Sequence, residues 1–115
     1  MIRVGLAAGA ACVLASGAFA QDAEPLKIGV TATLEGTYTV LGEDGMRGFE
    51  VALREWDKTA GGRPLEIIVA STDASPDSAV RAVRKLVEQD EVDVVISPLS
   101  GSEGIAIRDF AKTKP

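Results

Sequence analysis

Histidine is absent from the 115 residues of this chain, and cysteine occurs once, at position 12. Without histidine, the chain has no imidazole for general-base catalysis or for metal ligation. Cys12 lies in an N-terminal stretch that has the pattern of a targeting segment, so disulfides and thiolate metal sites are excluded from the remainder. The sequence therefore predicts no metal centre and no cofactor.

Basic residues are fewer than acidic ones: 12 Lys and Arg against 17 Asp and Glu, for a formal net charge of −5. A chain of this charge, with no concentrated basic face, is unsuited to nucleic acid or an anionic membrane as its main partner. Hydrophobic residues make up 46% and charged residues 25%, which is ordinary for a soluble globular protein. The composition therefore favours one small folded domain.

The first twenty residues have the pattern of a secretory signal peptide. Arg3 supplies a positive charge, the apolar run from Val4 to Leu14 is too short to span a bilayer, and Ala18-Phe19-Ala20 is a small-x-small cleavage site. We therefore expect cleavage after Ala20 and export of residues 21–115. A buried helix and a lipoprotein signal that ends at Cys12 are the alternatives.

The mature chain alternates between strand and helix patterns. β-branched and apolar runs predict strands over Leu26–Ala32, Pro64–Ser71 and Val92–Ser97. Helical spacing of apolar residues predicts three helices: one from Glu43 or Asp44 to Gly61-Gly62, one that begins at Ser75-Pro76, and one from Glu103. This order predicts an α/β fold in which a parallel sheet has helices on both faces.

Two further features concern burial. Met46, Phe49, Leu53 and Trp56 recur at helical spacing, so we expect all four, Trp56 included, in the core. The composition of Val92–Ser97 is typical of a strand buried on both faces, and Pro98 then prevents further ladder pairing because it lacks an N–H.

The small residues Ser100 to Gly104 connect this last strand to a helix. The first N–H groups of a helix lack partners within it, so the turn is expected to offer amides to an anion at the carboxyl edge of the sheet. An ordinary turn and helix cap is the alternative interpretation of Gly101 and Ser102. Pro115 stands where a fourth strand is expected, and three strands make a thin core, so we expect residues 21–115 to be part of a larger domain.

Several segments together carry a family resemblance. The exported chain opens with Leu26-Lys27-Ile28-Gly29-Val30 and has Leu34-Glu35-Gly36-Thr37-Tyr38 and Gly42 before its first helix. Asp73-Ala74-Ser75-Pro76 and then Val92 to Ser100 follow. In this order and spacing the chain resembles the leucine/isoleucine/valine-binding family, the type I periplasmic substrate-binding proteins of ABC transporters.

The resemblance implies two Rossmann-like α/β lobes that enclose a small molecule, with residues 21–115 supplying the first part of the amino-terminal lobe. It further implies a monomeric periplasmic protein that binds without catalysis and delivers its ligand to a membrane permease. The resemblance places the ligand's polar head at Ser100, Gly101 and Ser102, and a side wall from Tyr38 to Leu41. Many amino-acid binders have an aromatic residue where Leu41 stands, which leaves room for other carboxylates, aromatic acids or amides as ligands.

The sequence is also compatible with two other functions. A sensor domain that shares the fold but signals to a receptor has the same sequence features. Ser100-Gly101-Ser102-Glu103-Gly104 also fits the small-x-Ser-x-small pattern of a nucleophile elbow, with Ser102 as the nucleophile. A serine hydrolase needs a base, and these residues contain no histidine.

Overall fold

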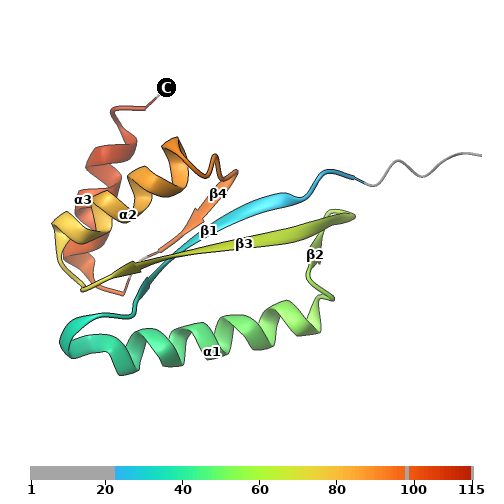
Figure 1. The fold of residues 1–115 in the computed structure, drawn as a ribbon, viewed down its shortest axis with the longest axis horizontal. Coiled ribbons are helices and arrows are strands. Elements are labelled where there is room, and N and C mark those ends of the chain that lie inside the picture. Colours follow the sequence, from blue (N-terminus) through green and yellow to red (C-terminus); the bar gives the residue numbers. More distant parts are fainter. Residues whose placement is uncertain (1–22, 98, 115) are drawn as a thin grey trace, which may run out of the picture.

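The sheet has β1 (Leu26–Thr33) between two neighbouring strands, and helices lie above and below the sheet in the view of Figure 1. The computed structural model describes residues 23–97 and 99–114; the signal-peptide prediction, Cys12 and the role assigned to Pro98 lie outside the described residues. The elements in chain order are β1 (Leu26–Thr33), the 3₁₀ turn η1 (Gly36–Tyr38), α1 (Thr39–Glu55), β2 (Thr59–Ala60), β3 (Arg63–Thr72), α2 (Pro76–Glu88), β4 (Val94–Ile96) and α3 (Gly101–Ala111).

The strand order is β2-β3-β1-β4, and β1 runs parallel to both β3 and β4. The α/β fold class with its parallel sheet is therefore confirmed. The short strand β2 was not predicted; it pairs antiparallel with the first two residues of β3.

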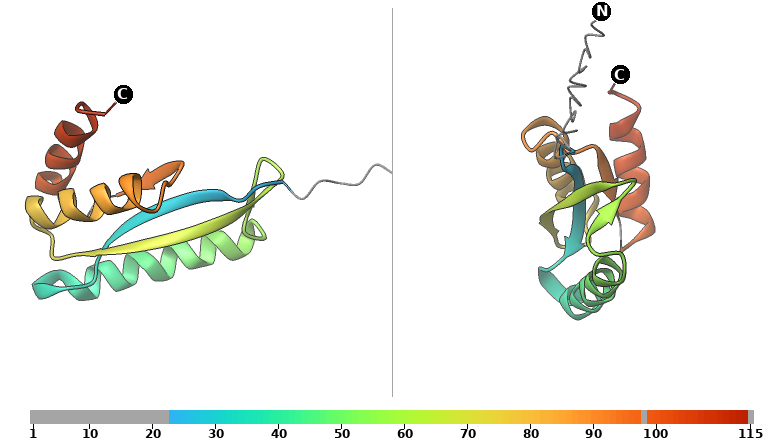
Figure 2. Two further views of the ribbon diagram at one scale, coloured as in Figure 1. Left: turned by 45° about the horizontal axis from the view of Figure 1, so that its top comes forward. Right: turned by 90° about the vertical axis from the view of Figure 1, so that its right-hand side faces the viewer.

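Helices cover both faces of the sheet, as predicted: α1 lies on one face, and α2 with α3 on the other (Figures 1 and 2). Ser75 caps α2 by accepting a hydrogen bond from the Ser78 N–H at 3.2 Å, with Pro76 as the first helical residue. The apolar face of α2 is buried, and Ala82 and Leu86 pack against Ala70 of β3. This contact forms the core of the domain.

α1 begins at Thr39, four residues before the predicted start at Glu43. Gly36, with φ +76°, starts a tight turn, and the Thr39 hydroxyl donates to the Gly36 carbonyl oxygen at 2.8 Å. The helix begins at this local bond, and its first turn contains no acidic residue. The prediction that Glu43 or Asp44 would lie in the first turn is therefore wrong. Leu41, expected in a loop, consequently lies in the first turn of α1.

The far end of α1 also differs from the prediction. The helix ends at Glu55, and the chain turns away through Asp57 and Lys58, both with positive φ. Trp56 is 73% exposed, so its assignment to the core is wrong, whereas Met46, Phe49 and Leu53 are half-buried. Gly61-Gly62, predicted to end the helix, instead forms the two-residue turn between β2 and β3, where both glycines have positive φ.

β4 is shorter and more exposed than predicted. It has three residues, and Val94 and Ile96 are 47% and 42% exposed, so the expectation of burial on both faces is wrong. Among the described residues β4 pairs only with β1, so it is an edge strand without a covering neighbour on its far side. In α3, Phe110 is buried, while Ala106 and Ile107 are half-buried.

Gly42 brings α1 into direct contact with the end of β1. A Cβ atom at this position would lie 1.8 Å from the Thr33 carbonyl oxygen, a distance that no side chain can occupy. Gly48, in the same helix, has open space around the corresponding position. The absence of a side chain at Gly42 therefore sets how closely the first turn of α1 approaches the carboxyl end of β1.

We expect Gly42→Ala to lower the free energy of unfolding by about 2–3 kcal/mol, because the methyl group must displace backbone. Gly48→Ala is the matched control, and it should raise stability by about 0.5–1 kcal/mol through helix propensity alone. Urea unfolding of the full-length protein, followed by circular dichroism, measures both. Equal stabilities of the two variants would contradict the close approach.

Candidate functional site

The candidate site lies at the carboxyl edge of the sheet, between β1 and β4. From β1 the chain passes through α1 to β3 on one side, and from β3 through α2 to β4 on the other. The connections after β1 and β4 therefore diverge to opposite faces of the sheet (Figure 1), and the hollow that residues from both connections line is the crevice between them. Ligands bind at this position in open α/β sheets.

Ser100 is the N-cap of α3, and it forms a reciprocal pair with Glu103. The Ser100 hydroxyl accepts a hydrogen bond from the Glu103 N–H at 3.3 Å, and the Glu103 carboxylate accepts one from the Ser100 N–H at 3.0 Å. This capping box starts α3 at Gly101, two residues before the predicted start at Glu103.

The capping box changes which amides face the crevice. The Ser100 N–H is engaged by Glu103, so it is not free for a ligand. The Gly101 and Ser102 N–H groups lie in the first helical turn, where no intrahelical acceptor is available. The Ser102 hydroxyl lies 3.1 Å from the Ser100 hydroxyl oxygen. Two backbone amides therefore remain as donors at this turn, and beside them lies the Ser102 hydroxyl, which is bonded to the hydroxyl of Ser100.

Glu103 also ties the turn to the sheet. Its side chain is 1% exposed, and its second carboxylate oxygen accepts a hydrogen bond from the Thr72 hydroxyl at 2.8 Å. The Thr72 hydroxyl in turn lies 3.2 Å from that of Thr33. A buried polar chain thus runs from the end of β1 through the end of β3 to the start of α3. This role of Glu103 was not predicted, although Ser-x-x-Glu before an apolar run is the sequence signal of a capping box.

Four of the five predicted site residues line one hollow of about 420 Å³. Tyr38 ends η1, Leu41 lies in the first turn of α1, and Ser100 and Ser102 come from the start of α3. Gly101 lies in the same turn but is not among the lining residues; the hollow is completed by Ala74 and Leu99.

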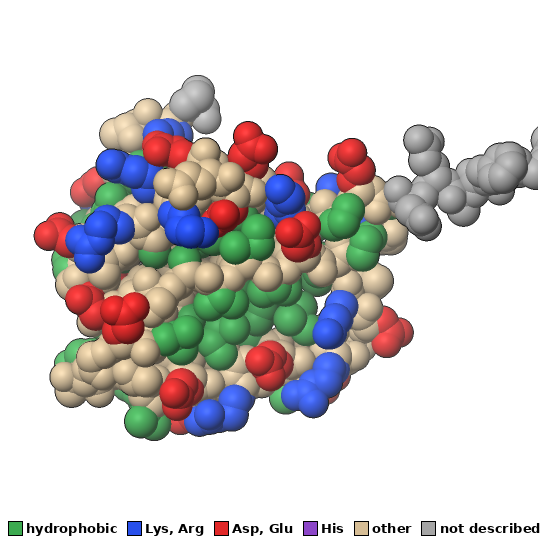
Figure 3. Space-filling view, viewed as in Figure 1, with side chains coloured by type: hydrophobic (Ala, Val, Ile, Leu, Met, Phe, Trp, Pro, Cys, Tyr) green, Lys and Arg blue, Asp and Glu red, His purple; other side chains and the backbone are tan. Residues whose placement is uncertain are grey.

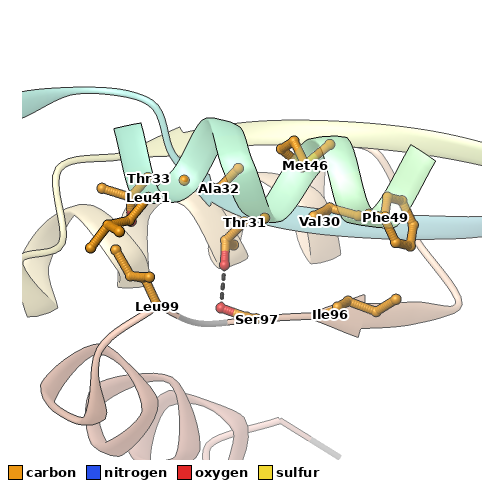
Figure 4. Close-up of a pocket in the computed structure, with 12 residues that line it drawn as sticks. Val30, Thr31, Ala32, Thr33, Leu41, Met46, Phe49, Ile96, Ser97 and Leu99 are labelled. Atoms are coloured by element: carbon orange, nitrogen blue, oxygen red, sulfur yellow. Dashed lines mark hydrogen bonds between the residues drawn. The ribbon is translucent and has the colours of Figure 1, made fainter. Parts of the chain in front are cut away.

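A second hollow of about 250 Å³ adjoins the first on the α1 face of the sheet (Figure 4). Leu41 and Leu99 line both hollows, and Figure 4 shows them close together at the carboxyl end of β1. The Thr31 and Ser97 hydroxyls form a hydrogen bond across β1 and β4. Leu99 was not predicted as a site residue, because an apolar residue after a strand gives no signal of its own.

The lining of both hollows is apolar or hydroxyl-bearing, and it includes no charged side chain among residues 23–97 and 99–114. Asp73, which follows β3, accepts hydrogen bonds from the Ser75 N–H at 2.9 Å and the Ser78 hydroxyl at 2.6 Å. Hydrogen bonds from Ser75 and Ser78 hold the pKa of Asp73 well below its ordinary value. Asp73 therefore stabilises the turn before α2 and lines neither hollow.

The part of the chain that the structure describes contains no group of three or more His, Cys, Asp or Glu side chains that could hold a metal ion. Within the same residues, no helix has both the length and the apolar character needed to cross a membrane.

The chain is similar to known proteins that have the same fold. A protein family described as "Periplasmic binding protein" matches residues 25–115. An ABC transporter substrate-binding protein from Sphaerobacter thermophilus is 35% identical, with a TM-score of 0.72, and the match covers 77% of this chain and 24% of that one. No curated protein matches the chain.

Two further solved structures are similar. A solute-binding protein of an ABC transporter from R. palustris, in complex with benzoate, is 27% identical, with a TM-score of 0.71 over 77% of this chain and 25% of that one. A leucine-binding protein from Thermotoga maritima MSB8, 22% identical over 76% of this chain and 25% of that one, shares the fold with a TM-score of 0.71. The chain spans about a quarter of the length of the structures it matches.

We expect Glu103→Ala to lower the free energy of unfolding by about 2–4 kcal/mol, because the buried Thr72 hydroxyl and the Ser100 N–H lose their acceptor. Glu35→Ala is the control: Glu35 is exposed and accepts one hydrogen bond, from Ser71, so its loss should cost less than about 1 kcal/mol. Denaturant unfolding of the full-length protein tests both. A Glu103→Ala variant as stable as Glu35→Ala would show that the buried chain of hydrogen bonds is not holding the turn.

Proposed function

The chain belongs to the periplasmic binding protein family, and on that premise we propose that it is part of the solute-binding protein of an ABC uptake transporter. The observation that carries this proposal is the match of the family over residues 25–115, which is nearly the whole of the described chain. Residues 1–20 are proposed to be the signal peptide that directs the protein to the periplasm. Residues 21–115 are then the first part of the amino-terminal lobe.

The ligand is proposed to sit against the crevice between β1 and β4. Tyr38 and Leu41 form one wall, and Ser100, Gly101 and Ser102 form the other, where Gly101 and Ser102 offer the hydrogen bonds. Gly101 and Ser102 amides at a helix N-terminus suit a carboxylate or a carbonyl oxygen, because both accept hydrogen bonds and favour the positive end of the helix dipole. The polar head of the ligand is therefore assigned to this turn.

The chemistry of the lining supports a ligand with an apolar body. Leu41 and Leu99 flank the hydroxyl groups, and no described side chain that lines the hollows carries a charge. A small carboxylate or amide fits this lining, whether it resembles a branched-chain amino acid or an aromatic acid. The benzoate bound to the R. palustris protein supports the aromatic acid.

Binding is proposed to act through closure of two lobes, without catalysis and without a cofactor. A ligand seated on the first lobe stabilises the closed arrangement by its contacts with the second lobe. The closed monomer is the form that the membrane permease recognises. The role of residues 21–115 in this cycle is to hold the ligand's polar head in a fixed position, which the buried Glu103 contacts favour.

Ser102→Ala in the full-length protein tests the proposed site. A thermal-shift screen of amino acids, aromatic acids and their amides first identifies a binding compound, and calorimetry then gives its dissociation constant. Loss of a hydroxyl hydrogen bond to a charged group should weaken binding about tenfold or more.

Thr59→Ala is the matched control, because it removes a hydroxyl at the opposite end of the sheet, where the Thr59 hydroxyl donates to the Trp56 carbonyl oxygen. Its dissociation constant should stay within about twofold of the wild type. Unchanged affinity in Ser102→Ala, or an equal loss in both variants, would contradict the assignment of the ligand to this turn.

A further inference from the structure

The hydrogen bonds of Glu103 use its side chain as an acceptor. One carboxylate oxygen accepts from the Ser100 N–H at 3.0 Å, and the other accepts from the Thr72 hydroxyl at 2.8 Å. A backbone N–H can only donate, and the Thr72 hydroxyl can itself accept from Thr33, whose hydroxyl lies 3.2 Å away. A carboxyl group that receives hydrogen bonds on both oxygens is an ionised acceptor, so a negative charge lies beneath the start of α3.

The hydroxyl of Ser100 has one proton and several acceptors within reach. It lies 3.0 Å from a Glu103 carboxylate oxygen, 3.1 Å from the Ser102 hydroxyl oxygen and 3.4 Å from the Ala74 carbonyl oxygen. Hydrogen bonds to an ionised acceptor are stronger than those to a neutral one, and the Glu103 contact is also the shortest of the three. The Ser100 proton is therefore directed to Glu103.

This use of the Ser100 proton fixes the role of the Ser102 hydroxyl. The Ser100 oxygen has two lone pairs: one accepts from the Glu103 N–H at 3.3 Å, and the other faces the Ser102 hydroxyl. The Ser102 hydroxyl must then be the donor in its contact with Ser100, and its own oxygen keeps lone pairs for a further partner. At this turn the Gly101 and Ser102 amides donate hydrogen bonds, while the Ser102 hydroxyl oxygen accepts one.

Glu103 also places its charge close to the turn. The Ser100 hydroxyl alone separates its carboxylate from the Ser102 hydroxyl. On the face seen in Figure 3, Asp and Glu side chains lie at the surface among Lys and Arg side chains, whereas Glu103 is 1% exposed and water screens it little. An anion on the Gly101 and Ser102 amides would be repelled by this buried charge, which offsets the attraction of the helix dipole.

We propose that this turn selects a primary carboxamide as the polar head of the ligand, and that Glu103 is the residue that determines this specificity. The inference rests on the proposed function and narrows its ligand class. The carbonyl oxygen of the carboxamide accepts from the Gly101 or Ser102 N–H, and its NH₂ group donates to the Ser102 hydroxyl oxygen. The carboxamide has no net charge, so Glu103 does not repel it.

A carboxylate matches the same turn less well. It has no proton to offer the Ser102 hydroxyl oxygen, and its charge approaches that of Glu103. A free amino acid brings the same carboxylate, and its ammonium group is attached to another carbon. A carboxamide has its acceptor and its donor on one carbon atom, and the turn has its N–H donor and its hydroxyl acceptor on one residue, Ser102.

Calorimetry on the full-length protein tests the assignment with two matched pairs of probes, benzamide with benzoate and isovaleramide with isovalerate. Within a pair the apolar body is the same, so the ratio of the two dissociation constants reports the polar head alone. In the pair that binds better, the amide should bind at least about tenfold more tightly than the carboxylate, because it gains a hydrogen bond and avoids a repulsion.

Glu103→Gln should reduce this preference for the amide about fivefold or more, because it removes the charge and keeps the size of the side chain. Glu66→Gln is the matched control: Glu66 is exposed on β3, and the same change there should alter the preference less than twofold. Ser102→Ala is the second variant, and it should weaken the amide about tenfold and the carboxylate less than twofold. Thermal unfolding shows that each variant is folded.

Tighter binding of a carboxylate than of its amide, binding of neither amide, or a preference that Glu103→Gln leaves unchanged would overturn the inference. If Glu103→Gln does not fold, an equal loss of amide and carboxylate affinity in Ser102→Ala would overturn it instead. A carboxylate that Ser102→Ala weakens would still locate the ligand at this turn, so only the assignment of its head would be wrong. Affinities that Ser102→Ala leaves unchanged for both compounds of a pair would contradict the proposed site itself.

Discussion

The buried carboxylate of Glu103 is the interaction on which the candidate site depends. It has 1% of its surface exposed, and it accepts hydrogen bonds from the end of β3 and from the N-cap of α3. A buried carboxylate is costly unless its oxygens are satisfied, and here both are. The start of α3 is therefore fixed relative to Thr72, and the Gly101 and Ser102 amides have one defined direction.

β1 makes this arrangement possible because it lies between the other two parallel strands. Its buried Thr31 and Thr33 reach Ser97 on one side and Thr72 on the other. Gly42 lets α1 approach within contact of the Thr33 backbone, which brings Leu41 to the mouth of the crevice. Hydroxyl groups and small residues, rather than large apolar ones, thus shape the edge where the ligand is proposed to bind.

The fold class was predictable from the sequence, whereas several local features were not. β-branched runs and helical spacing of apolar residues correctly predicted the three parallel strands and the helices on both faces of the sheet. The strand-turn-helix pattern singled out Ser100 and Ser102, the family resemblance added Tyr38 and Leu41, and these four residues line one hollow. Helix ends depend on single bonds, such as that from Thr39 to Gly36, which apolar spacing does not reveal. Burial of Trp56 and of β4 depends on neighbouring elements, so helical or strand periodicity alone misjudged both.

The most direct measurement is a crystal structure of the full-length protein with a bound compound found by thermal shift. The account predicts that the compound's carboxylate or carbonyl oxygen lies within hydrogen-bond distance of the Gly101 or Ser102 N–H, with its apolar body against Leu41. It also predicts that Glu103 keeps its bonds to Thr72 and Ser100. A compound bound away from the β1–β4 crevice, or an α3 turn packed out of its reach, would contradict the account.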